Sequence, residues 1–292
     1  MTEAETENEQ SASTSIVVAS VIIRAKDEER DIGRTLSALA SQTIASAVET
    51  IVVDSGSSDS TVEIVRGFGI EPIEIAASRF TYGGALNIGC AEARGEVLIA
   101  LSAHAVPTRS DWLERMIEPF ADSQIACVCG YAHGPDGEAL RTKLIQDAAL
   151  AEARPHWGYT NGSGAFRSEL WRERPFREDM PGTEDKEWAW YWLWRGWLSL
   201  VDPALAVEHD HEHEGLRTTY RRARREAHGI GMFAPVVPET VPELVRRWWN
   251  EKDGRPSHLR ARLSPSRAVH LVGGWRGQRA ADRWRRQAPQ PP

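Results

Sequence analysis

The chain has 292 residues, of which 41% are hydrophobic and 26% charged, and its 35 basic and 42 acidic residues give a formal net charge of −7. This composition is typical of a globular protein with a sizeable core, and no apolar run approaches the roughly 18 residues of a membrane-spanning helix. The charge is unevenly distributed, because the segment from Arg217 to the end has 17 basic and only 6 acidic residues. The acidic remainder argues against nucleic-acid binding by the main fold, whereas the basic segment is suited to a peripheral contact with an anionic membrane.

Residues 1–15 are polar and acidic and contain no aromatic side chain. We expect them to be disordered and to contain no secretory signal, because they lack an apolar core segment. The three cysteines, Cys90, Cys127 and Cys129, are too few for a disulfide scaffold and indicate a reducing compartment. We therefore predict a cytoplasmic protein, which a membrane contact of the basic segment would hold at the inner face of the membrane.

Buried strands and amphipathic helices alternate along the first half of the chain. Apolar, β-branched runs predict strands, and apolar residues at helical spacing between Ser or Asp caps and glycines predict helices. The expected strands cover residues 15–23, 49–54, 70–76, 96–102 and 125–131, and the expected helices cover 27–42, 57–69, 83–95 and 110–120. This alternation with short turns predicts a doubly wound, mostly parallel α/β sheet.

In such a sheet, ligands bind beyond the carboxyl ends of the strands. Polar residues follow three of the expected strands, at 24–28, 54–56 and 102–104. The first of these turns reads RAKDE and has no glycine, which argues against a dinucleotide-binding loop. Its carboxylates are suited instead to accepting hydrogen bonds from hydroxyls or base edges.

The second half of the chain is less regular and rich in tryptophan. The run EDKEWAWYWLWRGWLSLVD (184–202) predicts a helix that leads into a strand, and LRTTYRRARREAHGIG (216–231) predicts a basic helix. Several glycines and a PQPP end predict a loosely ordered tail over the last thirty residues. We expect a disordered N-terminus at 1–15, a main domain at 16–215, and a basic helical extension with a flexible tail at 216–292.

Five motifs occur in order between about residues 18 and 215. They are RAKDEER after the first strand, DSGSSDST after the second, a G-x-x-N helix before the fourth, the loop TNGSGAF, and the helix that opens TEDKEW. Each motif alone is a weak signal, but their order within one chain is a strong one. Together they resemble the family-2 glycosyltransferases, inverting enzymes of the GT-A fold, and within them the rhamnosyltransferase-like branch.

The resemblance implies a Rossmann-like, GT-A-type sheet and a hexosyltransferase that moves a sugar from a nucleotide-sugar donor to an acceptor hydroxyl. The acceptor would be a glycan, a lipid-linked molecule or a secondary metabolite, as in cell-wall or polysaccharide biosynthesis. The resemblance also implies site residues. The nucleotide would be bound by Ala25, Glu28, Asp54, Asn87 and Ser102, and the acceptor or sugar pocket would be lined by Asn161 and Gly162. We expect the tryptophan cluster of residues 184–202 to be mostly core, although Trp188, beside Asp185, is also a candidate stacking platform for an acceptor sugar in this pocket.

The resemblance further implies that Asp185 is the catalytic base, with Glu184 as the second candidate. An inverting transfer needs one carboxylate that takes the proton of the acceptor hydroxyl as that oxygen attacks. A structural interpretation stays open for each acid. Asp54 is suited to capping the following helix, and Glu184 and Asp185 are suited to the first turn of a helix, whose dipole favours negative charge.

The sequence departs from the family pattern where a D-x-D pair usually holds Mg²⁺ or Mn²⁺. Ser102 and His104 occupy these two positions. One hypothesis is a divalent cation held by His104, His209 or His211. The other is a metal-independent site, in which arginines of the basic helix such as Arg221 or Arg224 offset the charge of the leaving diphosphate.

Two other functions compete with the glycosyltransferase interpretation. A non-catalytic nucleotide- or sugar-binding domain would also have lost the metal-binding acids. A metallohydrolase built on the HDHEH segment (209–213) is disfavoured, because its histidines lack the i, i+4 spacing of zincin helices.

Overall fold

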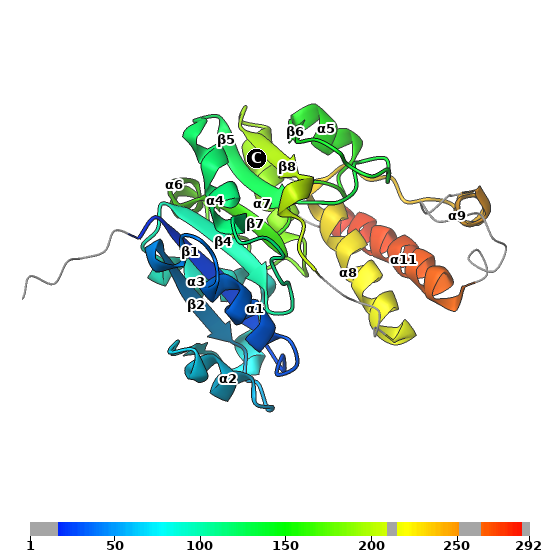
Figure 1. The fold of residues 1–292 in the computed structure, drawn as a ribbon. Helices are drawn as coiled ribbons and strands as arrows, with labels where there is room; N and C mark the ends of the chain where they lie inside the picture. The colour runs from blue at the N-terminus through cyan, green and yellow to red at the C-terminus, as the bar shows by residue number, and fades with distance from the viewer. Residues whose placement is uncertain (1–16, 209–214, 251–263, 288–292) are drawn as a thin grey trace, which may run out of the picture.

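The structure is a computed structural model that describes residues 17–208, 215–250 and 264–287. It contains one eight-stranded sheet with the strand order β3-β2-β1-β4-β7-β5-β8-β6 (Figure 1). The strands are β1 (Ala19–Ala25), β2 (Val48–Asp54), β3 (Ile73–Glu74), β4 (Val97–Ser102), β5 (Ile125–Gly130), β6 (Leu144–Gln146), β7 (Ser163–Arg167) and β8 (Leu198–Asp202). The helices are α1 (Ile32–Ala40), α2 (Thr61–Gly67), α3 (Tyr82–Glu92), α4 (Trp112–Ile117), α5 (Ala148–Ala153), α6 (Ser168–Glu173), α7 (Glu184–Leu193), α8 (Leu216–Phe233), α9 (Val241–Asn250) and α11 (Pro265–Gln287).

The first four strands form the parallel half of the sheet, as the sequence predicts. β1 pairs in parallel with both β2 and β4, and its residues Arg24 and Ala25 lie opposite Ser102 and Asp54 respectively. The polar turns that follow these strands therefore meet at one edge of the sheet. The expected strand at 15–23 begins later, at Ala19, and the expected strand at 70–76 shortens to Ile73–Glu74.

The other half of the sheet is mixed. β7 lies between β4 and β5 and is antiparallel to both, so the expected fourth and fifth strands are not neighbours. Gly164 lets the loop before β7 pack closely on the strand, because a Cβ at this position would lie 2.3 Å from the carbonyl oxygen of Thr160. β6 is also antiparallel to its neighbour β8. Two strands thus run against the direction of the mostly parallel sheet.

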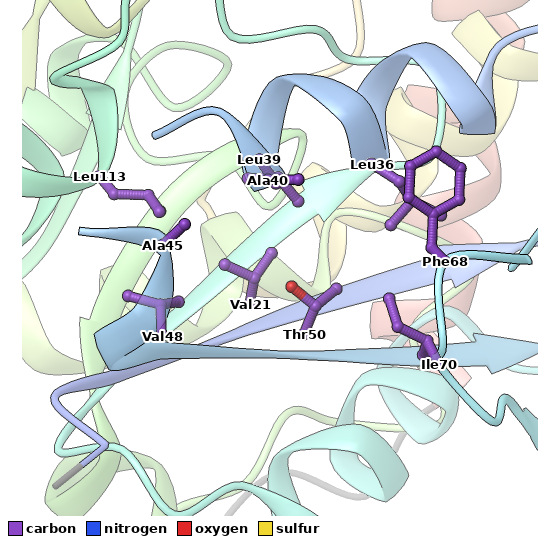
Figure 2. A pocket seen from close by; sticks show the side chains of 10 residues that line it. All are labelled: Val21, Leu36, Leu39, Ala40, Ala45, Val48, Thr50, Phe68, Ile70 and Leu113. Carbon is purple, nitrogen blue, oxygen red and sulfur yellow. The ribbon is translucent and has the colours of Figure 1, made fainter. Parts of the chain in front are cut away.

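Helices cover both faces of the sheet and enclose two apolar clusters. In the Trp-rich helix α7, Trp188 and Trp192 are 0% and 3% exposed, whereas Trp194, just after the helix, is 52% exposed. A small apolar pocket of about 100 Å³ lies on the α1 side of the sheet (Figure 2). Its sheet residues, Val21, Val48 and Thr50, belong to the first halves of β1 and β2, so this pocket lies away from the carboxyl ends of the strands.

The expectation of a flexible tail is wrong for residues 265–287, which form the 23-residue helix α11 packed side by side with α8 (Figure 1). Two of the glycines that suggested a loose tail, Gly273 and Gly277, are packing positions. A Cβ at Gly273 would lie 2.6 Å from the carbonyl oxygen of Tyr220, and one at Gly277 would lie 2.3 Å from that of Arg224. Small residues therefore let the backbones of the two helices approach closely.

The predicted disorder of residues 1–15 falls outside the described residues. Within the described ranges, none of the helices combines the length and the apolar character that crossing a membrane requires.

Candidate active site

The turns after β1 and β2 are joined by reciprocal hydrogen bonds. The carboxylate of Asp27 accepts from the backbone N–H of Ser58 at 2.7 Å, and the N–H of Asp27 donates to the hydroxyl of Ser57 at 2.9 Å. Asp27 has a positive φ of 54°, and the Ser58 N–H lowers the pKa of its carboxyl. The N–H of Glu29 donates in turn to Asp59 at 3.1 Å. The two turns are thus one preorganised unit.

Asp54 closes the second turn. Its Oδ1 accepts from the N–H groups of Gly56 and Ser57, both at 2.9 Å, and its Oδ2 accepts from the hydroxyl of Ser57. The residue is 1% exposed. Ala25, its neighbour in the sheet register, is 2% exposed and accepts from the N–H of Ser55. Asp54 therefore shapes the turn that lies beside the end of β1.

Glu28 and His104 meet across the end of the parallel half of the sheet. The Nδ1 atom of His104 lies 3.0 Å from Oε1 of Glu28. The backbone N–H of Glu28 also donates to the hydroxyl of Thr61 at 2.7 Å, which anchors this acid to the start of α2. The structure thus joins two residues that the sequence assigned to different roles, one to the nucleotide and one to a metal.

Hydrogen bonds from the loop before β7 link it to the end of β4 and to the start of α7. The N–H of Ser102 donates to the carbonyl oxygen of Gly162 at 3.0 Å, and the N–H of Asn161 donates to Oδ2 of Asp185 at 3.0 Å. Four of the residues that the sequence analysis names as site residues, Ser102, Asn161, Gly162 and Asp185, are therefore brought together.

Asn161 has an unsatisfied donor beside this carboxylate. The side chain is 2% exposed, and its Oδ1 accepts from the hydroxyl of Tyr159 at 2.9 Å. Its Nδ2 has no hydrogen-bond partner among the residues that the structure describes. Buried polar atoms are normally paired, so this amide is an unmet hydrogen-bond donor next to the Asp185 contact.

Glu184 and Asp185 are adjacent, but their environments differ. Glu184 is 3% exposed, and its Oε1 lies 3.0 Å from Nη1 of Arg24. Burial raises the pKa of the Glu184 carboxyl, and the charge of Arg24 opposes this shift. Thr183, which precedes the helix, has a positive φ of 67°. Glu184 is thus held inward by an ion pair, whereas Asp185 is half-buried and lines a cavity.

This cavity has a volume of about 490 Å³ and lies between the start of α7 and the C-terminal helices. Lys186 lies on the same wall as Asp185, and its Nζ donates to the carbonyl oxygen of Tyr159 at 3.1 Å. The remaining polar and aromatic side chains of the wall come from several elements. They are Tyr131, His156, Thr160, Thr183, Arg222, Glu226, Arg247, His270 and Gln278.

Two predicted ligand contacts are corrected by the structure. Trp188 is fully buried in the aromatic cluster, and its Nε1 donates to the carbonyl oxygen of Arg174 at 2.7 Å, so it offers no stacking surface to a sugar. Asn87 uses its amide to hold the segment before α7. It donates to the carbonyl oxygen of Phe176 at 2.9 Å and accepts from Nε1 of Trp171 at 3.0 Å.

The two arginines of the basic helix that the sequence analysis names do not line this cavity. Arg221 and Arg224 are exposed on α8, and the cavity is lined by Arg222 instead. Sequence reasoning gave no role to Arg222, Lys186 or Arg24, although Arg24 stood among the polar residues at the strand ends. Arg222 and Glu226, which both line the cavity, lie four positions apart and therefore share one face of α8.

The described residues do not form a complete metal site. Within the described part of the chain, no cluster of three or more His, Cys, Asp or Glu side chains is placed to hold a metal ion. Glu28 and His104 provide one oxygen and one nitrogen donor, and the predicted ligands His209 and His211 lie outside the described residues.

Comparisons with known proteins agree with this architecture. An 82-residue stretch of this chain is 35% identical to the O-antigen chain rhamnosyltransferase RfbN of Salmonella typhimurium. The match covers 27% of this chain and 26% of that protein. A 116-residue stretch is 34% identical to the glycosyltransferase AglE of Haloferax volcanii and covers 38% of each chain. The chain thus spans about a quarter to two fifths of the length of these curated relatives.

Solved structures show the same fold. The mannosyltransferase PcManGT from Pyrobaculum calidifontis, in complex with GDP-Man and Mn²⁺, aligns with a TM-score of 0.60 at 21% identity over 96% of this chain and 78% of that one. TarS from S. aureus aligns with a TM-score of 0.56 at 14% identity over 94% of this chain and 93% of that one. The sequence profile of "Glycosyl transferase family 2" matches residues 20–190. The chain therefore belongs to glycosyl transferase family 2.

Proposed function

We propose that the protein is an inverting hexosyltransferase in which Asp185 deprotonates the acceptor hydroxyl. The observation that supports this assignment most directly is the contrast within the acidic pair. Asp185 lines the cavity, whereas Glu184 is held by Arg24. A general base needs an accessible carboxylate within hydrogen-bond reach of its substrate, and only the first of these two acids meets that condition.

The donor would bind at the edge where β1, β2 and β4 end. The preorganised turn at Asp54, the Glu28 carboxylate and the backbone near Ala25 and Ser102 would face the nucleoside, with Glu28 accepting from a ribose or base group. Solved relatives of the same fold are complexes with GDP-Man and with UDP-GlcNAc, which supports a nucleotide-sugar donor. In this proposal Asn87 is a positioning residue that fixes the segment before α7.

The transfer follows from this placement. The acceptor oxygen attacks the anomeric carbon while its proton moves to Asp185, and the bond to the diphosphate oxygen breaks with its electron pair. The nucleoside diphosphate leaves, and the anomeric configuration inverts in a single displacement. The Nδ2 group of Asn161 would donate to a sugar hydroxyl beside the reacting centre.

The curated relatives support a polysaccharide-type acceptor, because RfbN is an O-antigen chain rhamnosyltransferase. We therefore propose transfer of rhamnose or another hexose to a glycan or lipid-linked acceptor in cell-surface polysaccharide synthesis. A peripheral membrane contact through the basic C-terminal segment also belongs to this proposal. Co-sedimentation of the full chain with anionic and with neutral vesicles would test it.

A donor and acceptor screen tests the enzyme proposal. Nucleotide sugars are incubated with simple acceptors, and the anomeric configuration of any product is read by NMR. A product with the configuration opposite to that of the donor supports inverting transfer, and a retained configuration contradicts it.

The replacement of the usual acid pair by Ser102 and His104 favours a second candidate, a binding domain without transfer activity. Nucleotide binding without turnover for any donor and acceptor would favour this alternative.

A further inference from the structure

We propose that the acceptor substrate has an anionic group, a phosphate or a carboxylate, that binds in the cavity beside His156, Arg247 and His270. The inference rests on the proposed function, because it takes Asp185 of the same cavity as the catalytic base. It adds the chemical class of the acceptor and assigns its recognition to the C-terminal helices.

The wall of the cavity has more basic than acidic side chains. Its two carboxylates, Asp185 and Glu226, face five basic groups, namely His156, Lys186, Arg222, Arg247 and His270. Burial lowers the pKa of Lys186, but Tyr131, Asp185, Cys129 and Glu226 outweigh burial and raise it overall. Lys186 therefore stays charged, and the two carboxylates balance only part of the basic wall.

His156 lies among the basic groups of this wall. Desolvation and the charges of Lys186, Arg247 and His270 together lower the pKa of its imidazole to about 4. All three of these neighbours are basic groups. A phosphate or carboxylate placed there would form charge-assisted hydrogen bonds with Arg247 and with the imidazoles.

The size of the cavity suits a sugar. A volume of about 490 Å³ lies within the ~300–1,000 Å³ of typical small-molecule sites. Gln278 on α11 also lines the cavity, and its buried Oε1 has no partner among the described residues. A ligand hydroxyl would satisfy this acceptor atom.

Arg247 is held in place by an acid of its own segment. Its Nη2 lies 3.0 Å from Oε2 of Glu239, and the side chains are 30% and 25% exposed. The backbone carbonyl of Glu239 accepts from Nε1 of Trp275 at 2.8 Å, which fixes this segment on α11. The ion pair orients the guanidinium of Arg247. Replacing its acid, as in Glu239→Gln, separates anion binding from structural support.

Equilibrium titration of the full chain tests the proposal with four probes, namely inorganic phosphate, glucose 6-phosphate, glucuronate and neutral glucose. We expect the anionic probes to bind more tightly than glucose. Arg247→Gln should weaken their binding about 10- to 100-fold, the loss expected for a charge-assisted hydrogen bond. Arg246→Gln, the matched change at the exposed neighbouring arginine, should leave it unchanged.

Two further measurements locate the anion and exclude a purely structural effect. The pKa of His156, followed by NMR of its ring protons, should rise when an anion binds, because a nearby negative charge favours the imidazolium. Glu239→Gln breaks the same ion pair but keeps the arginine, so it should retain or tighten anion binding. Equal losses in Arg247→Gln and Glu239→Gln would overturn the proposal.

The arms of the experiment also identify the group. Tighter binding of glucose 6-phosphate than of glucuronate indicates a phosphorylated acceptor, and the reverse order indicates a uronic acid. Glucose binding as tightly as both, without dependence on Arg247, overturns the inference. Because these readouts need no turnover, nucleotide binding and transfer to a neutral acceptor can succeed in the same preparation, in which case only this inference fails.

Discussion

Arg24 at the end of β1 and Glu184 at the first residue of α7 form an ion pair of 3.0 Å, although 160 positions separate them in the chain. The same arginine donates to the carbonyl oxygen of Tyr82 at 2.6 Å. The pair therefore joins the donor side of the sheet to the helix that presents Asp185. The position of the proposed base depends on a residue that makes no contribution to the proton transfer itself.

Loss of Arg24 should destabilise the fold. Arg24→Met leaves the carboxylate of Glu184 buried without its partner, so we expect a loss of about 3–5 kcal/mol in the free energy of unfolding, measured by urea denaturation. The double variant Arg24→Met with Glu184→Gln should recover most of this loss, because it removes the uncompensated charge. A single variant as stable as the wild type would contradict this prediction.

Asp185→Asn should retain donor binding and lose most transfer activity. Removal of a general base typically lowers the rate by about 10²- to 10⁴-fold. Glu184→Gln should lower activity less, since that carboxylate is turned to Arg24, and Glu63→Gln on the exposed start of α2 serves as the control. Wild-type turnover in Asp185→Asn, measured with saturating donor, would refute its assignment as the base.

Nucleoside diphosphates should stabilise the protein more than free sugars do. A ligand at a hundredfold excess over its Kd stabilises the native state by about 2.7 kcal/mol. Thermal melting with UDP, GDP, dTDP and CDP measures this effect. Failure of all four to shift the melting temperature at millimolar concentration would contradict a nucleotide site at the ends of β1, β2 and β4.

Chelation should separate the two versions of the diphosphate site. Glu28 and His104 present an oxygen and an imidazole nitrogen, a pair that suits Mn²⁺ better than Mg²⁺. After treatment with EDTA, we expect Mn²⁺ to restore more activity than Mg²⁺ in the wild type and to restore little in His104→Ala. Full activity after exhaustive chelation would instead favour the metal-independent version, and Arg222 would be the first arginine of α8 to substitute.

The glycines of α11 should respond in opposite ways to the same substitution. Gly277→Ala places a methyl group 2.3 Å from the carbonyl oxygen of Arg224, and we expect a loss of about 1–3 kcal/mol from overpacking. A Cβ at Gly274 meets no atom within 4 Å, so Gly274→Ala should stabilise the helix by about 0.5–1 kcal/mol. Thermal melting of both variants checks the sign of each change.

The sequence predicted the parallel half of the fold well, because each element there has its own local signals. Apolar runs end at polar turns, and Ser, Asp and Gly residues mark the helix ends, as at Gly69. The antiparallel insertion of β7 was not predictable, since the pairing of a strand depends on distant partners. The helix α11 was missed because glycine has the same local signature in a loose tail and in a tight helix pair.

The candidate site was predicted in its order along the chain but not in its contacts. The E-D motif identified Asp185 and Glu184 together, and only their tertiary partners separate the accessible acid from the one paired with Arg24. The order of residues places Trp188 beside the acids, but it does not show that this ring fills the aromatic cluster. Side-chain direction and burial are properties of the packed fold and have no local sequence signal.

The reciprocal hydrogen bonds of Asp27 with Ser57 and Ser58 have a consequence for how the turns of the proposed donor site open. Because each of the two turns supplies partners to the other, neither can fray while its neighbour stays folded. The amide hydrogens of Asp27, Glu29 and Ser58 should therefore exchange with solvent at similar rates, as a single opening unit. A nucleotide that binds either turn would slow exchange in both.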